Sequence, residues 1–406
     1  MKHIFYKIVL LLYLFLSSHP FCSAQSDDKI MIIIIDGARY SETLGDLSKT
    51  YTPEMWELSK QGSVLDNFQN DNYTYTSRAI PALWCGAWTE IGSKFYNGKT
   101  SSHAVLPTIF EYYRKQKNMP ANECFYVMKY LPDLWLPSFD VDYGPDYWPE
   151  FHSVGYSDKD VAIQAQLVLD THHPHFMLVY LADVDHSGHS GNWSEYINAI
   201  HTADSLVAVL WQKLQSDPFY KGSTTMIVTN DHGRHDDQHD GFQGHGCGCE
   251  GCRHIEFLAL GPNIKKNYKS FAYHSIPDMA VTAAYILDIE PTKATGYIIQ
   301  EIFETTGINQ DLNQQIFLKE NFPNPFYENT RINYYLYEPS NIQISIFNIR
   351  GEQIVILTNE WQTQGEKSVE WNAKDKLENT VDSGIYFARL IVGNQVKIIK
   401  LLYAPN

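Results

Sequence analysis

The chain has 406 residues and a formal net charge of −16, and 44% of its residues are hydrophobic. A chain of this length is expected to form two or more domains, at least one of which buries a sizeable core. Its acidic balance disfavours nucleic-acid partners, because binding a phosphate backbone requires clustered Lys and Arg. We therefore expect no nucleic-acid-binding surface.

The N-terminus has the order of a secretory signal peptide. Lys2 and Lys7 precede an apolar run at residues 8–16, and a small-residue cleavage site ends at Ala24. The run is too short to cross a bilayer, which needs about 20 residues. We predict that residues 1–24 are a signal peptide and that the mature protein is secreted or held at the cell surface. An uncleaved N-terminal anchor is the alternative.

Residues 25–309 alternate short apolar runs with longer amphipathic stretches, a pattern typical of an α/β domain with a mainly parallel sheet sandwiched by helices. The predicted strands are short and apolar enough to be buried on both faces: Ile30 to Ile35, Phe176 to Leu181, Thr224 to Thr229 and Ile255 to Leu260. The predicted helices have apolar residues three and four apart: Pro53 to Lys60, Ser77 to Trp84, Asp158 to Leu169, Trp193 to Leu214 and Pro277 to Leu287.

A linker is predicted at residues 310–318, followed at residues 319–406 by short alternating strands of a small immunoglobulin-like β-sandwich. The strands are NIQISIFNI, EQIVIL, KSVEWNA, GIYFARLIV and QVKIIKLLY. With its PNPF, WNAKD and SGIYF landmarks in that order, this segment resembles the sorting domain of type IX secretion cargo. The resemblance implies the type IX secretion machinery as a partner. A generic carbohydrate-binding or spacer module is the alternative.

Three of the predicted strands run directly into loops that contain Asp or His. The segments are IIIIDGARY, VYLADVDHSGHSG and IVTNDHGRH. Ligands of open α/β sheets bind beyond the carboxyl ends of the strands, so these side chains can converge although they are distant in sequence. Carboxylate and imidazole ligands suit a catalytic zinc site. The candidate ligands are Asp36, Asp185, His189, Asp231 and His232.

These residues give the domain a resemblance to the alkaline phosphatase superfamily, close to its nucleotide pyrophosphatases/phosphodiesterases. The family's Asp-x-x-Gly-His element is present as DHSGH and its Asp-His-Gly element as DHG. Its last histidine is His245, the first of HGCGCEGCRHIEFLALGP, because His-Gly lies at nearly the family's distance before the closing Gly-Pro. The resemblance implies two Zn²⁺ ions per chain. One would be held by Asp185, His189 and His245, and the other by Asp36, Thr76, Asp231 and His232.

Other residues compete for some of these roles. Asp183 is the rival of Asp185, which the four-residue step to His189 favours. The remaining histidines of the loop, His235, His239 and His254, are either donors to the ligands or solvated polar residues.

Five cysteines remain after Cys22 leaves with the signal peptide, so at least one thiol stays unpaired in a monomer. For Cys247, Cys249 and Cys252, we expect a disulfide that braces the His245 loop. A zinc knuckle is disfavoured because the sequence offers no paired second half. The other two are Cys85 and Cys124.

The resemblance also implies a nucleophile at the start of a helix, ten residues before a glycine. In NYTYTSRAIPALWCG this residue is Thr76, with Thr74 and Ser77 as rivals. A helix start favours an arriving anion, although a Thr there is most often an N-cap. In the diesterase branch an Asn follows the nucleophile by 21 residues and contacts a phosphate oxygen. Asn97 stands at that position, although beside Gly98 it also suits a turn.

The resulting hypothesis is a zinc-dependent phosphoesterase that forms a phosphothreonine intermediate. Diesters are favoured over monoesters, because the Lys and Arg pair of the monoesterases is not evident: Lys129 could fill one place, and Arg78 could supply charge or pair with a surface carboxylate. A sulfatase is disfavoured because TYTSR begins with Thr where the formylglycine signature has Cys or Ser, and because it lacks the Pro of that signature. A phosphoglycerate mutase would need an inserted domain. A binding protein with an inactive site is disfavoured by the complete ligand set.

Overall fold

The structure is a computed structural model that describes residues 28–129, 136–304, 316–318, 321–336, 339–393 and 395–405. The predicted signal peptide and residues 310–315 of the predicted linker lie outside these ranges. Among the described helices, none combines the length and the apolar character needed to cross a membrane.

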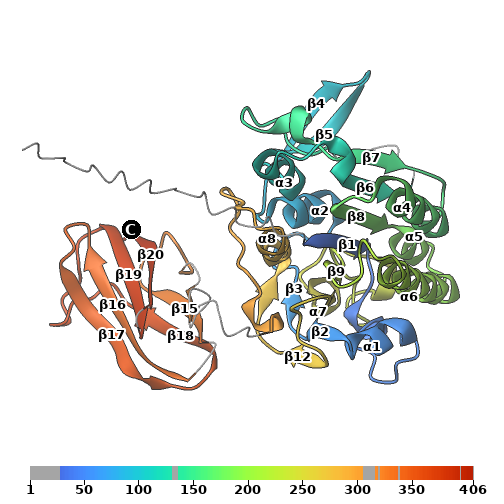
Figure 1. Ribbon diagram of the computed structural model, residues 1–406. Helices are drawn as coiled ribbons and strands as arrows, with labels where there is room; N and C mark the ends of the chain where they lie inside the picture. The colour runs from blue at the N-terminus through green and yellow to red at the C-terminus, as the bar shows by residue number, and fades with distance from the viewer. Residues whose placement is uncertain are drawn as a thin grey trace, which may run out of the picture.

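An eight-stranded sheet forms the centre of the N-terminal part (Figure 1), in the order β12-β2-β11-β9-β1-β8-β6-β7. Its neighbouring strands are parallel except where β11 pairs with β9 and β2. The predicted mainly parallel α/β fold is therefore confirmed. The strands are β1 (Lys29–Ile35), β2 (Gly62–Leu65), β6 (Cys124–Met128), β7 (Glu150–Ser153), β8 (Phe176–Leu181), β9 (Thr224–Thr229), β11 (Phe257–Leu260) and β12 (Tyr268–Ser270).

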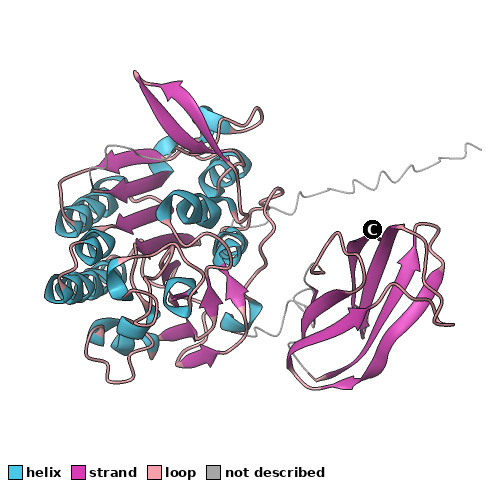
Figure 2. Ribbon diagram, turned by 180° about the vertical axis from the view of Figure 1, so that it is seen from behind, coloured by secondary structure: helices cyan, strands magenta, loops and turns pink. Residues whose placement is uncertain are grey.

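The alternation of side chains along β1 explains why both faces of the sheet are covered. Ile32 packs in one core with α2 (Thr76–Cys85), α3 (Ile109–Lys117) and α8 (Ile276–Ile286). Ile33 packs in a second core with α1 (Pro53–Ser59), α4 (Asp158–His172) and α6 (Trp193–Ser216). Figure 2 shows helices on both sides of the sheet. A strand buried on both faces has a continuous apolar sequence, as residues 30–35 of β1 do.

The predicted strands at residues 176–181 and 224–229 match β8 and β9 residue for residue. The strand predicted at residues 255–260 is interrupted at Glu256, which separates β10 (His254–Ile255) from β11. The backbone N–H of Glu256 donates to Oδ1 of Asn230 at 2.7 Å. β10 belongs instead to a small sheet with β3 (Phe68–Gln69) and β13 (His274–Ser275).

The C-terminal part forms antiparallel sheets around a hydrophobic core of its own, which includes Phe326, Ile344 and Trp371. One sheet contains β14 (Ile316–Leu318), β15 (Thr330–Leu336) and β18 (Gly365–Trp371). The other contains β16 (Ser340–Asn348), β17 (Gln353–Gln362), β19 (Gly384–Val392) and β20 (Gln395–Tyr403). Each of the five predicted strands has a counterpart here.

Candidate active site

The three predicted loops meet at one edge of the central sheet because their strands are adjacent and parallel. Ile35 of β1 is in register with Leu181 of β8, and Ile34 is in register with Thr229 of β9. Asp36 follows β1 directly, and its backbone N–H donates to the carbonyl of Leu181 at 2.9 Å. The short helix α5 (Asp183–His189) begins two residues after β8, and the Asp-His-Gly motif follows β9.

Asp185, His189 and His245 come together at this edge. Nε2 of His189 lies 3.3 Å from Oδ2 of Asp185 and 3.1 Å from Nε2 of His245. Nε2 of His245 lies 3.7 Å from Oδ1 of Asp185. Three potential ligand atoms therefore converge as the sequence analysis expects for one metal ion. Asp185 and His245 also form a potential metal-binding group with His232.

The second expected group surrounds the hydroxyl of Thr76. Its Oγ1 lies 3.1 Å from Nε2 of His232 and 3.5 Å from Oδ1 of Asp36. Nε2 of His232 is 3.4 Å from Oδ1 of Asp36 and 3.5 Å from Oδ2 of Asp231. Asp36, Asp231 and His232 are all buried.

Backbone carbonyls orient the two central histidines. Nδ1 of His232 is 2.8 Å from the carbonyl oxygen of Gly233, and Nδ1 of His245 is 3.1 Å from that of Thr74. A carbonyl oxygen only accepts, so each Nδ1 carries the proton in these contacts. Each Nε2 is then an acceptor, and a metal-ligating histidine normally has this arrangement.

The buried carboxylates of the site lie close enough to repel one another, so a nearby cation would stabilise them. Burial, together with the negative charges of Asp231 and Asp185, raises the pKa of Asp36 well above its usual range. Burial and the charge of Asp185 raise the pKa of Asp231 to about 7. Burial and the nearby His232 lower the pKa of His245 to about 4. Carboxylates that repel one another beside an uncharged imidazole are suited to holding cations.

A metal ion fits these residues for a second reason. Oδ2 of Asp231 is buried and has no hydrogen-bond partner among the described residues. Such an atom is costly unless it has a partner, and a coordinated cation would provide one. Carboxylate and imidazole atoms without sulfur are typical ligands of catalytic zinc. The described residues therefore fit a metal centre.

Thr76 is the first residue of α2 and does not cap it. Tyr75 occupies the N-cap position, and Gly86 ends the helix with a φ of 65°. The hydroxyl of the rival Thr74 donates to the carbonyl of Cys247 at 2.7 Å, which gives it a structural partner. The N-terminus of a ten-residue helix favours an anion next to the Thr76 hydroxyl.

Asn97 is not brought to this cluster. It occupies the turn between β4 (Ile91–Tyr96) and β5 (Lys99–Ala104) and is exposed, with a φ of 48° followed by 81° at Gly98. Asn-Gly is the preferred sequence for such a hairpin turn, because both positions need positive φ. The turn interpretation therefore accounts for Asn97, and the geometry gives it no contact with the predicted ligands.

The other rivals also have partners outside the cluster. Asp183 accepts from Lys129 Nζ at 2.9 Å and from the backbone N–H of Asp158 at 2.8 Å. Arg78 Nη2 is 3.7 Å from a carboxylate oxygen of Glu90. These contacts favour Asp185 over Asp183 as the metal ligand. They also support the alternative in which Arg78 pairs with a surface carboxylate.

Two residues that support the ligands were missed by the sequence analysis. The guanidinium of the fully buried Arg234 donates to Oδ1 of Asp185, and the hydroxyl of Tyr180 donates to Oδ2 of Asp36. Arg234 directly follows the Asp-His-Gly motif, and this adjacency was the available signal. Nothing in the sequence indicates that Tyr180, one of several aromatic residues in apolar strands, contacts a ligand.

The expected disulfide near His245 is not formed. All five described cysteines are unbonded. The sulfurs of Cys247 and Cys252 lie 3.6 Å apart, and Cys85 and Cys124 are buried elsewhere.

Several solved structures have a similar fold. Murine ectonucleotide pyrophosphatase/phosphodiesterase 5, inactive and in complex with AMP, is 13% identical, with a TM-score of 0.51 over 68% of this chain and 100% of that chain. The 2-O GAG sulfatase BT1596 is 12% identical, with a TM-score of 0.54 over 85% of each chain. A mutant of the alkaline phosphatase PafA is 11% identical, with a TM-score of 0.51 over 68% of this chain and 98% of that chain.

No curated protein matches the chain in sequence. At these identities the structural likenesses establish the fold alone. The family described as "Type I phosphodiesterase / nucleotide pyrophosphatase" matches residues 30–363, which is most of the chain and includes every predicted ligand. The chain therefore belongs to the type I phosphodiesterase / nucleotide pyrophosphatase family, whose members are hydrolases of phosphoester bonds.

Proposed function

We propose that the protein is a secreted, zinc-dependent phosphodiesterase that uses Thr76 as its nucleophile. The observation that carries the proposal is the position of the Thr76 hydroxyl. It lies at the start of α2, within 3.5 Å of both Asp36 and His232, where the ends of β1 and β9 meet. A hydroxyl beside cation-binding residues and a helix N-terminus is suited to attack on a phosphate.

We propose that Asp185, His189 and His245 hold one Zn²⁺ and that Asp36, Thr76, Asp231 and His232 hold the other. When bound, the two ions supply Lewis-acid chemistry, which lowers the pKa of the attacking hydroxyl and neutralises charge on phosphate oxygens. Residues of the chain orient this set: Tyr180 donates to Asp36, and Arg234 donates to Asp185.

The reaction has two steps. Oγ1 of Thr76 attacks phosphorus, the hydroxyl proton passes to solvent, and the bond from phosphorus to the leaving alkoxide breaks. The alkoxide takes a proton from water, and a phosphothreonine that still carries the second ester group of the diester remains. A second water then attacks that phosphorus, the bond to Oγ1 breaks, and Thr76 recovers its proton. The N–H groups at the start of α2 face the phosphate in both steps.

Diesters, including those with a nucleotide group, are the substrate class that we favour. The family comprises phosphodiesterases and nucleotide pyrophosphatases, and the murine neighbour holds AMP. The one lysine considered for a monoester's second negative charge, Lys129, is paired with Asp183. A diester carries a single negative charge on its phosphate, so its binding does not require the Lys and Arg pair of the monoesterases.

The test is a hydrolysis panel with zinc-loaded protein on an aryl phosphodiester, an aryl phosphate and an aryl sulfate. We expect the diester to be cleaved fastest, and Thr76→Ala to lose activity by orders of magnitude while it still binds zinc. Ser77→Ala is the matched control, because it removes the neighbouring rival hydroxyl. Faster cleavage of the sulfate, or full activity in Thr76→Ala, would contradict the proposal.

We further propose that residues 319–406 act as a type IX sorting domain and residues 25–309 as the catalytic domain. The support is the order of the PNPF, WNAKD and SGIYF landmarks in the C-terminal part and the absence of any predicted ligand after His245. A chain that ends at residue 309 should hydrolyse the same diester but remain cell-associated in a type IX secreting host. Export of that truncated chain at the level of the full chain would refute the sorting role.

A further inference from the structure

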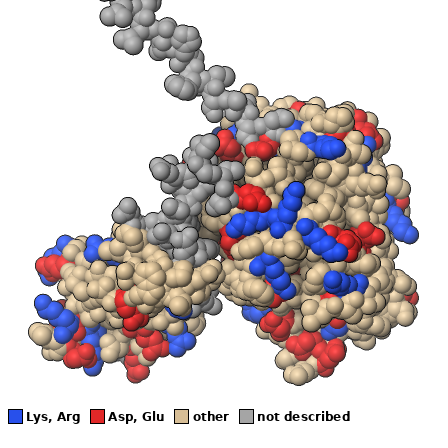
Figure 3. Space-filling view, turned by 60° about the horizontal axis from the view of Figure 1, so that its bottom comes forward, with Lys and Arg blue, Asp and Glu red and all other residues tan. Residues whose placement is uncertain are grey.

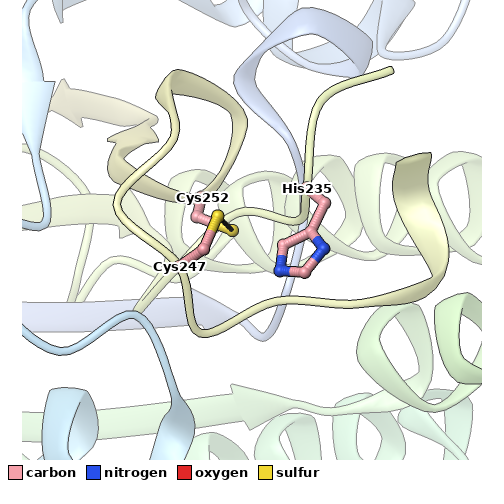
Figure 4. A group of neighbouring side chains, drawn as sticks. All are labelled: His235, Cys247 and Cys252. Atoms are coloured by element: carbon pink, nitrogen blue, oxygen red, sulfur yellow. Dashed lines mark hydrogen bonds between the residues drawn. The ribbon is translucent and has the colours of Figure 1, made fainter. Parts of the chain in front are cut away.

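A second cluster of potential metal ligands lies in the loop between β9 and β11, outside the proposed zinc pair. The ligand atoms of His235, Cys247 and Cys252 all lie within 4.8 Å of one another. Figure 4 shows the two sulfur atoms next to each other with the imidazole ring of His235 beside them. Cys252 is fully buried.

The imidazole of His235 indicates that this cluster could hold a metal ion. Both of its ring nitrogens are buried, and neither has a hydrogen-bond partner among the described residues. Buried imidazole nitrogens are nearly always satisfied by a donor, an acceptor or a metal ion, because an unsatisfied polar group is costly. The two sulfurs lie within 4.8 Å of a ring nitrogen, and neutral thiols are weak hydrogen-bond partners.

The separation of the sulfurs fits coordination of a common ion. Sγ of Cys247 lies 3.6 Å from Sγ of Cys252. Two thiolates on a tetrahedral Zn²⁺, each with a Zn–S bond of about 2.3 Å, stand about 3.8 Å apart. The backbone N–H of Cys249 donates to Sγ of Cys247 at 3.3 Å, the kind of support that a ligating thiolate usually receives.

We propose that His235, Cys247 and Cys252 bind a third ion, a structural Zn²⁺. Cys249 would supply a fourth ligand, because it lies between the two other cysteines in the same loop and its backbone N–H already contacts Sγ of Cys247. The resulting Cys₃His set is one of the usual ligand sets of structural zinc. Thiolates distinguish this site from the proposed catalytic pair, whose ligands are all oxygen and nitrogen.

The position of the cluster indicates what the ion would stabilise. Cys247 is two residues after His245, and its carbonyl accepts from Thr74 at 2.7 Å. The carbonyl of Cys252 accepts from the backbone N–H of Gly233, next to His232, at 2.9 Å. The ion would therefore tie together the two segments that carry His232 and His245.

The experiment uses the full mature chain loaded with Co²⁺. We expect a near-ultraviolet thiolate-to-cobalt absorption in the wild type and its loss in the double variant Cys247→Ser/Cys252→Ser. The double variant should also contain one equivalent of zinc less than the wild type. Cys85→Ala, which removes a buried thiol elsewhere in the core, is the matched control and should keep both signals.

Two further measurements separate this inference from the proposed catalytic function. Asp185→Ala should lose a catalytic zinc but keep the thiolate-to-cobalt absorption. Peptide mapping without reduction should show all five thiols free after the metal is chelated. Absence of the absorption in the cobalt-loaded wild type, or a Cys247–Cys252 disulfide in the unreduced digest, would overturn the proposal whatever the protein hydrolyses.

Discussion

The guanidinium of Arg234 is completely buried and donates to Oδ1 of Asp185, a predicted metal ligand. Its Nη2 also donates to the carbonyl oxygen of Gln243 at 2.7 Å, and its Nε donates to that of Phe242. One side chain therefore fixes a carboxylate at the end of β8 and the loop that leads to His245. In the proposed enzyme Arg234 would be a positioning residue, because it would act on the metal ion only through Asp185.

Replacing Arg234 with Met should lower the affinity for one zinc by about 10- to 100-fold, the usual effect of losing a residue that orients a ligand. The physical reason is that Asp185 loses its fixed orientation. Zinc titration followed by metal analysis measures the effect. Gln243→Ala is the control, because it keeps the carbonyl acceptor and should leave the affinity unchanged. Equal zinc affinities in Arg234→Met and the wild type would contradict the positioning role.

Tyr180→Phe should weaken zinc binding by the ligand group that contains Asp36, again because a ligand loses its fixed orientation. Tyr180 is buried on β8, and its hydroxyl donates to Oδ2 of Asp36, which would be left without that partner. We expect diesterase activity and zinc affinity to fall together by about 10- to 100-fold, with the circular dichroism unchanged. Tyr126→Phe, at a buried tyrosine on the neighbouring strand β6, should be close to the wild type. If both variants behave alike, the contact with Asp36 has no special importance.

Asp185→Ala and His245→Ala should each remove one zinc and most of the activity. Asp185 on the short helix α5 and His245 on a loop converge on the same point outside the two hydrophobic cores, so their loss leaves these cores intact. Metal analysis after dialysis should give one equivalent less than the wild type in each variant. An unchanged zinc content in either variant would refute the ligand assignment.

His274 should make stability depend on pH. It is buried, with Nδ1 2.9 Å from Oδ2 of Asp278 and Nε2 3.0 Å from Oε1 of Glu301. Burial alone would lower its pKa, but the charge of Glu301 and the hydrogen bonds to both carboxylates raise it from 6.5 to about 10. A raised folded-state pKa stabilises the fold fully below about pH 6.5, and this contribution is lost as the pH rises to about 10.

The His274→Gln variant should therefore be most destabilised near pH 6 and approach the wild type near pH 10. Between these values the wild type should lose up to about 1.4 kcal/mol of unfolding free energy per pH unit more than the variant. Urea unfolding at a series of pH values measures the difference. The control is His201→Gln, on helix α6, which should follow the wild type. A constant difference between His274→Gln and the wild type would exclude the coupling.

The sequence was most informative where burial on both faces made the pattern unambiguous. β8 is a continuous apolar run and β9 is a short run of β-branched and apolar residues, and polar loops follow both, so their ends and the ligands after them could be predicted. α5 was not predicted, because seven residues rich in Asp, His and Gly have no helical periodicity. The segment forms a helix because it is anchored at the end of β8.

The supporting contacts could not be predicted, because they depend on the tertiary fold. The spacing that suggested a catalytic role for Asn97 is indistinguishable from a hairpin turn until the hairpin is seen. The contact between Arg234 and Asp185 joins residues 49 positions apart. Its geometry follows from how two loops pack beyond the sheet, and no local pattern encodes it.

The distance in sequence between the site residues has a consequence for how activity appears during refolding. Thr76 and His232 are 156 residues apart, and they meet only when β9 has paired with β1. Closing a long loop lowers the entropy of the chain before the new contacts have formed, so non-local pairings of this kind form late. A partly folded chain should therefore have no partial activity, and the first turnover should report that the central strands have assembled.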